Sequence, residues 1–347
     1  MGRRSPSGAN IGQVAAEAGV SAATVSRVIT GADRVAPETA RRVREAIRAL
    51  GYEPNRLAQG LRRRRTMTIG LVLSGFTNSF FFELIAQTAE VGKEAGYSML
   101  VSGDADPEGE ALRLAGGRIV DGIVFVAAHG ESRASRLNDL SIPIVCFDRA
   151  PADLSCPVVQ IDNERGAREV TRHLADQGAR RIAHIAGPAE VLASQPRRTG
   201  YRLALEDAGI ERDPALEVPG DFTEEAGYRA MYELLGRGEP FDGVFAANDL
   251  MAIGAMRAAA ESGIRVPDDL LVGGFDGISS GRFTVPRLTT CAQPISHMAR
   301  LAVAKLLRTI ESGETAQHRE DIVVAGELLV RESSTRCGSP QDSPPAR

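Results

Sequence analysis

The chain has 347 residues, of which 43% are hydrophobic and 25% are charged, as is typical of a globular protein with a buried core. No apolar run approaches the roughly 20 residues of a membrane-spanning helix, and the basic N-terminus is not followed by the apolar stretch of a secretory signal. The four cysteines have no C-x-x-C spacing, so we expect reduced thiols in a cytoplasmic protein.

Charge is distributed unevenly along the chain. Residues 1–66 contain 13 arginines and five acidic residues, a net charge of +8, whereas the remainder carries 28 basic and 40 acidic residues, a net charge of −12. A cationic segment on an acidic body predicts a polyanionic partner for that segment. A solvated disordered arm would have the same composition.

Helical periodicity in residues 10–50 argues against a disordered arm. Asn10 and Gln13 have the spacing of a capping box, and the apolar residues of 11–18 recur on one helical face. Ser21 is a favourable N-cap for a second helix. Two short helices joined by a glycine-containing turn form the helix-turn-helix plan.

A third helix is predicted from Pro37 to Leu50, with its apolar residues, Leu50 included, completing a small core. In a helix-turn-helix unit the second helix enters the major groove of DNA. Arg27 is the candidate for a bidentate contact to guanine, and the other arginines are candidates for phosphate contacts. The positions on the second helix predicted to face DNA are Ser21, Ala22, Ala23, Thr24, Ser26 and Arg27.

The run from Asn10 to Ile29 resembles the headpiece of the LacI/GalR (lactose repressor) family. It contains the pattern Val-Ala…Ala-Gly-Val-Ser-x-x-Thr-Val-Ser-Arg-Val, which is much more specific than a general helix-turn-helix. Gln13 stands where the family usually has Asp. The resemblance implies a ligand-responsive transcriptional repressor that binds a pseudo-palindromic operator as a dimer. It divides the chain into a headpiece of residues 1–53 and the segments that follow.

Residues 54–66 are predicted to form a hinge helix and linker. A helix over 56–62 is too short to persist alone in water, and Gly60 weakens it further. The segment is similar to the family's hinge helix, which implies that two such helices pair in the minor groove and that Leu61 wedges between base steps. Packing of Leu61 against the body is the alternative. The hinge residues implied to contact DNA are Asn55, Ala58, Gln59 and Leu61.

Residues 67–337 alternate β-rich runs with amphipathic helical stretches, which predicts doubly wound parallel sheets in an α/β fold with two lobes. Strands are predicted at 68–73, 97–102, 122–127, 142–147, 157–161, 181–186, 241–247, 270–275 and 321–331. Helices are predicted at 80–95, 164–177, 197–209, 224–236, 249–262 and 295–312. Ligands of such sheets bind beyond the carboxyl ends of the strands, where the sequence places Ser74, Asp148, Asn248, Asp249 and Asp276.

The body resembles the family's effector domain, which is similar to periplasmic sugar-binding proteins. The matching stretches include Arg197-Arg-Thr-Gly-Tyr, Ala247-Asn-Asp-Leu-Met-Ala and Gly274-Phe-Asp. The resemblance implies that the chain crosses between the lobes near residues 161, 291 and 321. Lobe 1 would comprise 67–161 plus 292–321, and lobe 2 would comprise 162–291 plus 322–337. The tail, 338–347, is rich in Pro and Ser and is predicted to be disordered, which favours a dimer over a tetramer.

The same resemblance implies an effector site in the cleft between the lobes, made by Asn78, Phe80, Arg197, Phe222, Asn248 and Asp276. Arginine supplies hydrogen-bond donors, aspartate accepts from paired hydroxyls, and asparagine does both. The alternatives are capping of the next element for Asn248 and Asp276, and core packing for Phe80 and Phe222. A sugar or sugar derivative is the implied effector, with a nucleoside or nucleobase second.

An enzyme is not expected. Gly277-Ile-Ser-Ser-Gly281 matches the G-x-S-x-G nucleophile elbow, but the residues after it do not predict the helix that the elbow requires. The five histidines have no metal-binding spacing, and there is no phosphate loop or dinucleotide-binding glycine motif. We therefore expect no catalytic residue, no cofactor and no metal. A solute-binding receptor is the second hypothesis, and the basic headpiece argues against it.

Overall fold

The structure, a computed structural model, describes residues 9–30, 35–52, 65–75, 79–127, 134–151, 153–313 and 318–336. The chain divides into two compact units, one ending at Met67 and the other beginning at Thr68. Within the described residues, no helix is both long and apolar enough to cross a membrane. Some predicted features lie outside the described residues, namely Asn55, Ala58, Gln59, Leu61, Asn78 and the tail 338–347.

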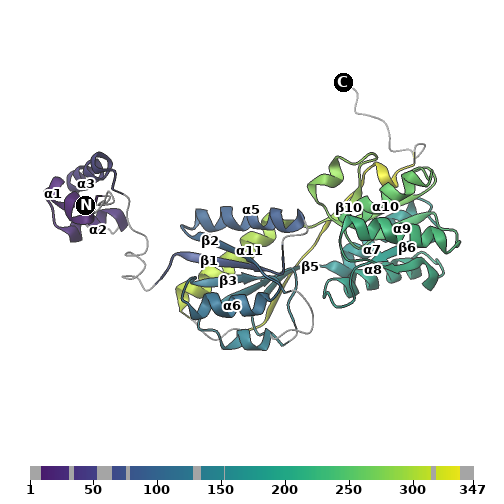
Figure 1. Cartoon of the computed structure of the whole chain (residues 1–347), viewed down its shortest axis with the longest axis horizontal. Helices are drawn as coiled ribbons and strands as arrows, with labels where there is room; N and C mark the ends of the chain where they lie inside the picture. The colour runs from purple at the N-terminus through teal and green to yellow at the C-terminus, as the bar shows by residue number, and fades with distance from the viewer. Residues whose placement is uncertain are drawn as a thin grey trace, which may run out of the picture. The chain divides into compact units, whose positions relative to one another are not determined.

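The first unit is a three-helix headpiece (Figure 1): α1 (Ile11–Glu17), α2 (Ala22–Thr30) and α3 (Pro37–Leu50). Each helix contributes a fully buried valine to one small core, Val14, Val25 and Val43. Leu50 was predicted to join this core, but the prediction is wrong because Leu50 is the last residue of α3 and is 36% exposed.

The headpiece helices begin and end at the predicted signals. Asn10 and Gln13 form both bonds of the capping box, at 3.0 and 2.8 Å. The Ser21 hydroxyl accepts a hydrogen bond from the Thr24 N–H at 3.1 Å and caps α2. Gly51 ends α3 in the left-handed region with φ of 57°, where glycine has no steric penalty.

The second unit has two α/β lobes, each built on a six-stranded sheet. The first sheet has the order β11-β5-β4-β3-β1-β2, and all its pairs are parallel. Its strands are β1 (Thr68–Leu73), β2 (Ser98–Gly103), β3 (Gly122–Phe125), β4 (Ile144–Phe147), β5 (Pro157–Ile161) and β11 (Glu320–Val324). Figure 1 shows two helices on one face, α5 (Ser79–Glu94) and α11 (Ile295–Ser312), and α6 (Pro107–Gly116) on the other.

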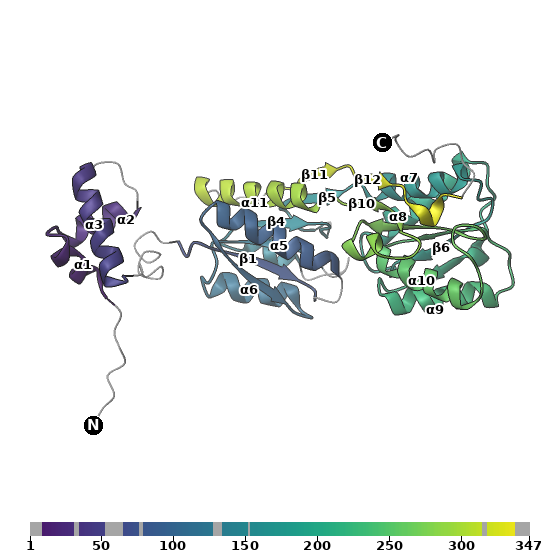
Figure 2. The ribbon, with the colours of Figure 1, turned by 90° about the horizontal axis from the view of Figure 1, so that it is seen from above.

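The second sheet has the order β12-β10-β9-β8-β6-β7 and is parallel except for the pair β10–β12. Its strands are β6 (Ile182–Ala186), β7 (Glu217–Pro219), β8 (Gly243–Ala246), β9 (Leu271–Asp276), β10 (Thr289–Ala292) and β12 (Glu327–Leu329). Figure 2 shows β6 between two pairs of packed helices, α7 (Asn163–Asp176) with α8 (Ser194–Asp207), and α9 (Glu224–Gly236) with α10 (Asp249–Glu261).

The chain passes between the lobes three times, after β5, after β10 and between β11 and β12 (Figure 2). The single strand predicted at 321–331 is therefore two strands in different sheets, and the third crossing follows Val324. The break falls at Gly326. A Cβ at Gly326 would lie 2.5 Å from Cys291 Sγ and 3.0 Å from Ile161 Cδ1. Because glycine lacks this atom, the third crossing can pack against the other two.

Candidate functional site

Side chains from both lobes line one cavity of about 130 Å³. All of them lie at or beyond the carboxyl ends of strands, where ligands of doubly wound sheets bind. The first lobe contributes Phe80 and Phe81 from the first turn of α5, and Asp148 and Arg149 from the segment after β4. The second lobe contributes Arg197, Asp221, Phe222, Asp276 and Gln293.

Arg197, in the first turn of α8, contacts several groups around the cavity and is 3% exposed. Its Nε donates to Asn163 Oδ1 at 2.8 Å, and its Nη1 donates to the Ala247 carbonyl at 2.6 Å. The same Nη1 lies 3.3 Å from Asp276 Oδ1. Its guanidinium carbon lies 3.9 Å from the centroid of the Phe275 ring, a cation–π distance. These contacts hold the guanidinium in one orientation.

Asp276, the last residue of β9, is 5% exposed. Gln293 Nε2 donates to its Oδ1 at 2.9 Å. Burial raises the pKa of Asp276 to about 6, an increase that the charge of Asp148 adds to and that Arg197 and Gln293 oppose. The carboxyl group is therefore mostly ionised near neutral pH, and it titrates in the mildly acidic range.

The first-lobe wall carries a second ion pair. Arg149 Nη1 lies 3.1 Å from Asp148 Oδ2, and Arg149 Nε donates to the Ala127 carbonyl at 2.7 Å. Burial lowers the pKa of Arg149, while the neighbouring Asp148 carboxylate opposes this effect. Two buried acceptors at the cavity, Asp148 Oδ1 and Gln293 Oε1, have no hydrogen-bond partner among the described residues. Such atoms are stabilised when a ligand donates to them.

Three non-glycine residues at the cavity have positive φ: Asp148 at 68°, Phe222 at 69° and Asp276 at 111°. This backbone conformation is uncommon for L-residues and is concentrated at ligand sites, where the surrounding structure maintains it. Asn248 supplies part of that support, because its Nδ2 donates to the Phe222 carbonyl at 3.1 Å. The strain aims the Phe222 ring and the two carboxylates at the cavity.

The structure brings four of the six predicted effector residues to the cavity, Phe80, Arg197, Phe222 and Asp276. Asn248 is not among the residues that line the cavity. Its Oδ1 accepts from the Met251 N–H at 3.0 Å and caps α10. This is the capping alternative named above. Asn78 lies outside the described residues.

Sequence reasoning did not assign Arg149, Asn163 or Gln293 to the site. Asn163 and Gln293 are buried polar residues that follow the ends of β5 and β10, so their position next to a strand end was an available signal. Arg149 directly follows Asp148, which had been noted only as a strand-end residue. In the part of the chain that the structure describes, no three His, Cys, Asp or Glu side chains are grouped as a metal site.

The second candidate surface is on α2 of the headpiece. Ser21, Ala22, Ala23 and Arg27 are exposed there, and Thr24 and Ser26 are partly buried. The Ser21 and Thr24 hydroxyls lie 2.9 Å apart and share the helix cap. Arg27 is therefore the long polar side chain on a surface otherwise made of methyl groups and capping hydroxyls.

The sequence matches known proteins over nearly its whole length. Residues 10–55 match bacterial regulatory proteins of the lacI family, and residues 171–334 match the periplasmic binding protein-like domain. The HTH-type transcriptional regulator CelR of Thermobifida fusca is 40% identical over 332 residues, which cover 92% of this chain and 96% of the relative. This chain belongs to the LacI family. The resemblance predicted from the headpiece motif is confirmed, and the chain is a ligand-responsive DNA-binding transcriptional regulator.

Solved structures of LacI-family regulators share its fold. A complex of a transcriptional regulator CelR with cellobiose is 37% identical with a TM-score of 0.71, and the match covers 94% of this chain and 99% of that one. The Lac repressor dimer bound to operator and the anti-inducer ONPF is 26% identical with a TM-score of 0.83, covering 95% and 100%. The predicted fold class, a helix-turn-helix headpiece with a two-lobed periplasmic-binding-protein-like domain, is confirmed.

Proposed function

We propose that this LacI-family regulator is a homodimeric repressor whose affinity for a pseudo-palindromic operator is changed by a sugar bound between the lobes. The observation that carries the proposal is the cavity lined by both lobes, with the fixed pair Arg197–Asp276 beside the rings of Phe80 and Phe222. A ligand that contacts both lobes has different affinities for different lobe arrangements, which is the thermodynamic requirement for control.

The residue types of the cavity suit a sugar. The Asp276 carboxylate and the Gln293 amide oxygen accept from hydroxyls, and an aromatic ring such as Phe222 covers the apolar face of a pyranose. Relatives point the same way, since a CelR structure contains cellobiose and another LacI-family structure contains ribose. A nucleoside, which also combines hydroxyls with a flat face, is the second candidate.

On the DNA side, Arg27 is proposed to read a guanine in the major groove, with Ala22 and Ala23 limited to methyl contacts. The hinge residues Asn55, Ala58, Gln59 and Leu61 are proposed to enter the minor groove, with Leu61 as the wedge. Two headpieces on one dimer imply half-sites about one helical turn apart. Such a protein works in the cytoplasm, where the DNA is.

An enzymatic role is not proposed. The nucleophile elbow needs an α-helix directly after the serine. Here Ser279 begins a single 3₁₀ turn, Ser279–Arg282, so the elbow geometry is not met. A solute-binding receptor is also not favoured, because the headpiece helices fold around their own core and present Arg27 outward.

A thermal-shift screen of sugars and nucleosides, followed by gel shifts with a pseudo-palindromic operator, tests the proposal. We expect a sugar to raise the melting temperature, since a ligand of the native state stabilises it. The same sugar should change operator affinity. A shift with nucleosides alone would replace the proposed effector class, and failure to bind any such operator at low salt would favour the receptor.

A further inference from the structure

The turn after β9 contains Asp276 in an uncommon backbone conformation. Asp276 and Gly277 have consecutive positive φ angles, 111° and 77°. The turn is also tightly packed, because a Cβ at Gly277 would lie 2.5 Å from Ala292 Cβ at the end of β10. An aspartate keeps such a φ only where its surroundings maintain it. The orientation of the Asp276 carboxylate at the cavity therefore depends on the groups that fix this turn.

The pairing of β9 with β10 fixes one side of the turn. The Gln293 N–H donates to the Asp276 carbonyl at 3.0 Å. The Gly277 N–H donates to Thr290 Oγ1 at 3.2 Å. Both partners lie within β10 or directly after it, so these bonds continue the strand pairing. The next N–H of the turn, that of Ile278, has a partner from a different element.

That partner is Asp249, which fixes the other side of the turn. Asp249 is the first residue of α10, and it follows β8, the neighbour of β9 in the sheet. Its Oδ2 accepts from the Ile278 N–H at 2.8 Å. A Cβ at Gly274 would lie 2.3 Å from its Oδ1, so the carboxyl group packs directly on the backbone of β9. The glycine at 274 is what lets Asp249 reach the turn.

The Asp249 carboxyl group is fully buried, and its Oδ1 has no hydrogen-bond partner among the described residues. The titratable groups that act on it are Asp276 from β9, Cys291 from β10 and Arg331 from the segment after β12. Cys291 is uncharged near neutral pH, because burial raises its pKa to about 12. Burial, and then the charge of Asp276, raise the pKa of Asp249 to about 8, whereas the pKa of Asp276 is about 6. Near neutral pH, Asp249 therefore keeps its proton and Asp276 carries the negative charge.

We propose that Asp249 is a positioning residue of the effector site, whose protonated carboxyl group anchors the turn after β9 and so orients Asp276 toward the cavity. Asp249 does not line the cavity, so it acts through Asp276. The inference rests on the proposed effector site, in which Asp276 contacts the ligand. It gives the start of α10 two supporting roles, since the adjacent Asn248 donates to the carbonyl of Phe222, the other strained residue of this lobe at the cavity.

Hydrogen exchange tests the anchoring without any ligand. The peptide covering 274–284 should exchange faster in Asp249→Ala than in the wild type, since the Ile278 N–H loses its acceptor. Asp249→Asn should exchange like the wild type, because the amide keeps an acceptor oxygen and is neutral like the protonated acid. Asp268→Asn is the control, since the Asp268 side chain is 48% exposed. Equal exchange of this peptide in the wild type and in Asp249→Ala would overturn the inference.

Calorimetric binding of cellobiose and of ribose to the full-length protein tests the positioning. Asp249→Ala should bind at least about tenfold more weakly than the wild type, and Asp249→Asn should stay within about threefold of it at neutral pH. Between about pH 7 and pH 9 the affinity of the wild type should fall, because ionisation of Asp249 places two carboxylates in one buried site. The affinity of Asp249→Asn should not fall in this way. A fall shared by Asp249→Asn overturns the inference, even where Asp249→Ala does not fold.

The inference and the proposed site fail in different ways. Affinity that is lost in Asp276→Asn but unchanged in Asp249→Ala overturns the positioning role and leaves the site standing. Affinity that survives in Asp276→Asn overturns the site, and the inference with it. If neither sugar binds the wild type, the proposed effector class is wrong, and hydrogen exchange alone decides whether Asp249 anchors the turn.

Discussion

Arg197 and Asp276 form an ion pair, Nη1 to Oδ1 at 3.3 Å, in which the side chains are only 4% and 6% exposed. Removing one member of such a pair leaves the other charge buried without compensation. The pair thus joins α8 to the end of β9 and at the same time forms one wall of the cavity. Substitution of Arg197 or Asp276 should therefore impair effector binding and leave DNA binding largely intact.

Asp276→Asn should abolish the response of the protein to its effector, because the amide cannot neutralise Arg197 or accept two hydroxyls as a carboxylate does. Operator affinity without effector should stay within about threefold of wild type, since the headpiece is a separate compact unit. Gel shifts without and with the sugar measure the operator affinity and its change in response to the effector. A response that persists in the variant would move the effector site elsewhere.

Gly187→Ala should weaken effector binding without unfolding the protein. A Cβ at this position would lie 2.2 Å from Phe222 Cζ and 2.6 Å from Ser194 Oγ, so the ring must leave its place at the cavity. We expect a loss of roughly tenfold in affinity, which corresponds to about 1.4 kcal/mol of lost aromatic contact. Gly236→Ala is the control, because nothing lies within 4 Å of its added atom. Equal affinities of the two variants would contradict the role of Phe222.

Arg27→Ala should weaken operator binding by roughly 1–3 kcal/mol and relax the preference at one base pair of each half-site. The reason is that Arg27 is the candidate guanine reader on the exposed face of α2. Competition gel shifts with single-base operator variants measure the preference. Arg48→Ala on α3 is the comparison, and it should reduce affinity for all sequences alike. The same uniform loss for Arg27→Ala would make Arg27 a phosphate contact.

The buried carboxyl of Asp249 should make the free energy of unfolding of the second unit decrease as pH rises. Burial, and then the charge of Asp276, raise its pKa to about 8 despite hydrogen bonds from Thr290 and from the backbone of Ile278 and Gly277. An aspartate in the unfolded chain ionises near pH 3.9. Between about pH 4 and pH 8 the folded state therefore keeps a proton that the unfolded state loses, and the free energy of unfolding falls across that window.

Asp249→Asn should remove this component, so its free energy of unfolding should change less between pH 5 and pH 8 than that of the wild type. Urea unfolding at several pH values measures the difference. Asp268→Asn serves as the control because the Asp268 side chain is 48% exposed. A pH dependence identical in wild type and Asp249→Asn would show that Asp249 ionises normally.

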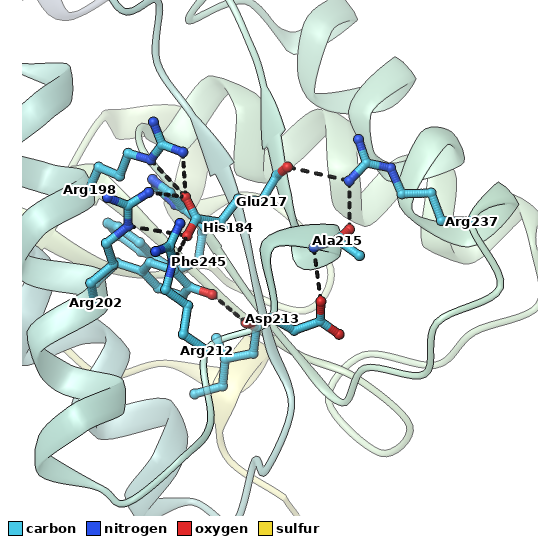
Figure 3. Close-up of polar contacts among 11 residues, drawn as sticks. His184, Arg198, Arg202, Arg212, Asp213, Ala215, Glu217, Arg237 and Phe245 are labelled. Carbon is cyan, nitrogen blue, oxygen red and sulfur yellow. Dashed lines mark hydrogen bonds and ion pairs between the residues drawn. The ribbon is translucent and has the colours of Figure 1, made fainter.

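Glu217→Gln should destabilise the second lobe near neutral pH. Burial alone would raise the pKa of Glu217, but hydrogen bonds from Arg202, Arg212 and Arg198 lower it to about 2 (Figure 3). A depressed carboxyl pKa stabilises the fold above the ordinary value near 4.5, and the stabilisation is lost as pH falls toward 2. We expect the free energy of unfolding to fall by roughly 2–4 kcal/mol at pH 7. This range is centred below that for fully buried pairs because the arginines are partly exposed.

The loss for Glu217→Gln should shrink when unfolding is measured at pH 3. Glu239→Gln provides the comparison, since Glu239 is 49% exposed and pairs only loosely with Arg181, at 3.3 Å. A loss for Glu217→Gln that does not depend on pH would mean that packing, and not charge, accounts for it.

The sequence predicted long periodic elements well. The runs 68–73, 224–236 and 295–312 match β1, α9 and α11 residue for residue. It missed α6, β7 and β10. The segment of α6 begins after an Asp106 cap but contains two glycines, which weaken the helical signal. The two strands have three and four residues, too few to show a period.

The cavity was predictable only in part. Arg197 and Asp276 were assigned by resemblance, and their residue types agree with the chemistry. Arg149 was missed because its position at the cavity depends on how two lobes, built from distant parts of the chain, come together. Gln293 was missed because it meets Asp276 only through the pairing of β10 with β9, and β10 was not predicted. Periodicity along the sequence carries no information about such distances. Asn248 was assigned to the site by resemblance, but in the structure it caps α10. A polar side chain after a strand suits helix capping as well as ligand binding, so the sequence alone does not distinguish the two roles.

Gly326 has a mechanical consequence for the regulator. This residue lies against Ile161 and Cys291, so the third crossing of the chain packs on the other two at one point. Separation or sliding of the lobes would break this packing, and rotation about it would not. A rotation produces the largest displacement far from its axis. A ligand that favoured one rotated arrangement of the lobes would therefore displace the far ends of the lobes more than the residues around Gly326.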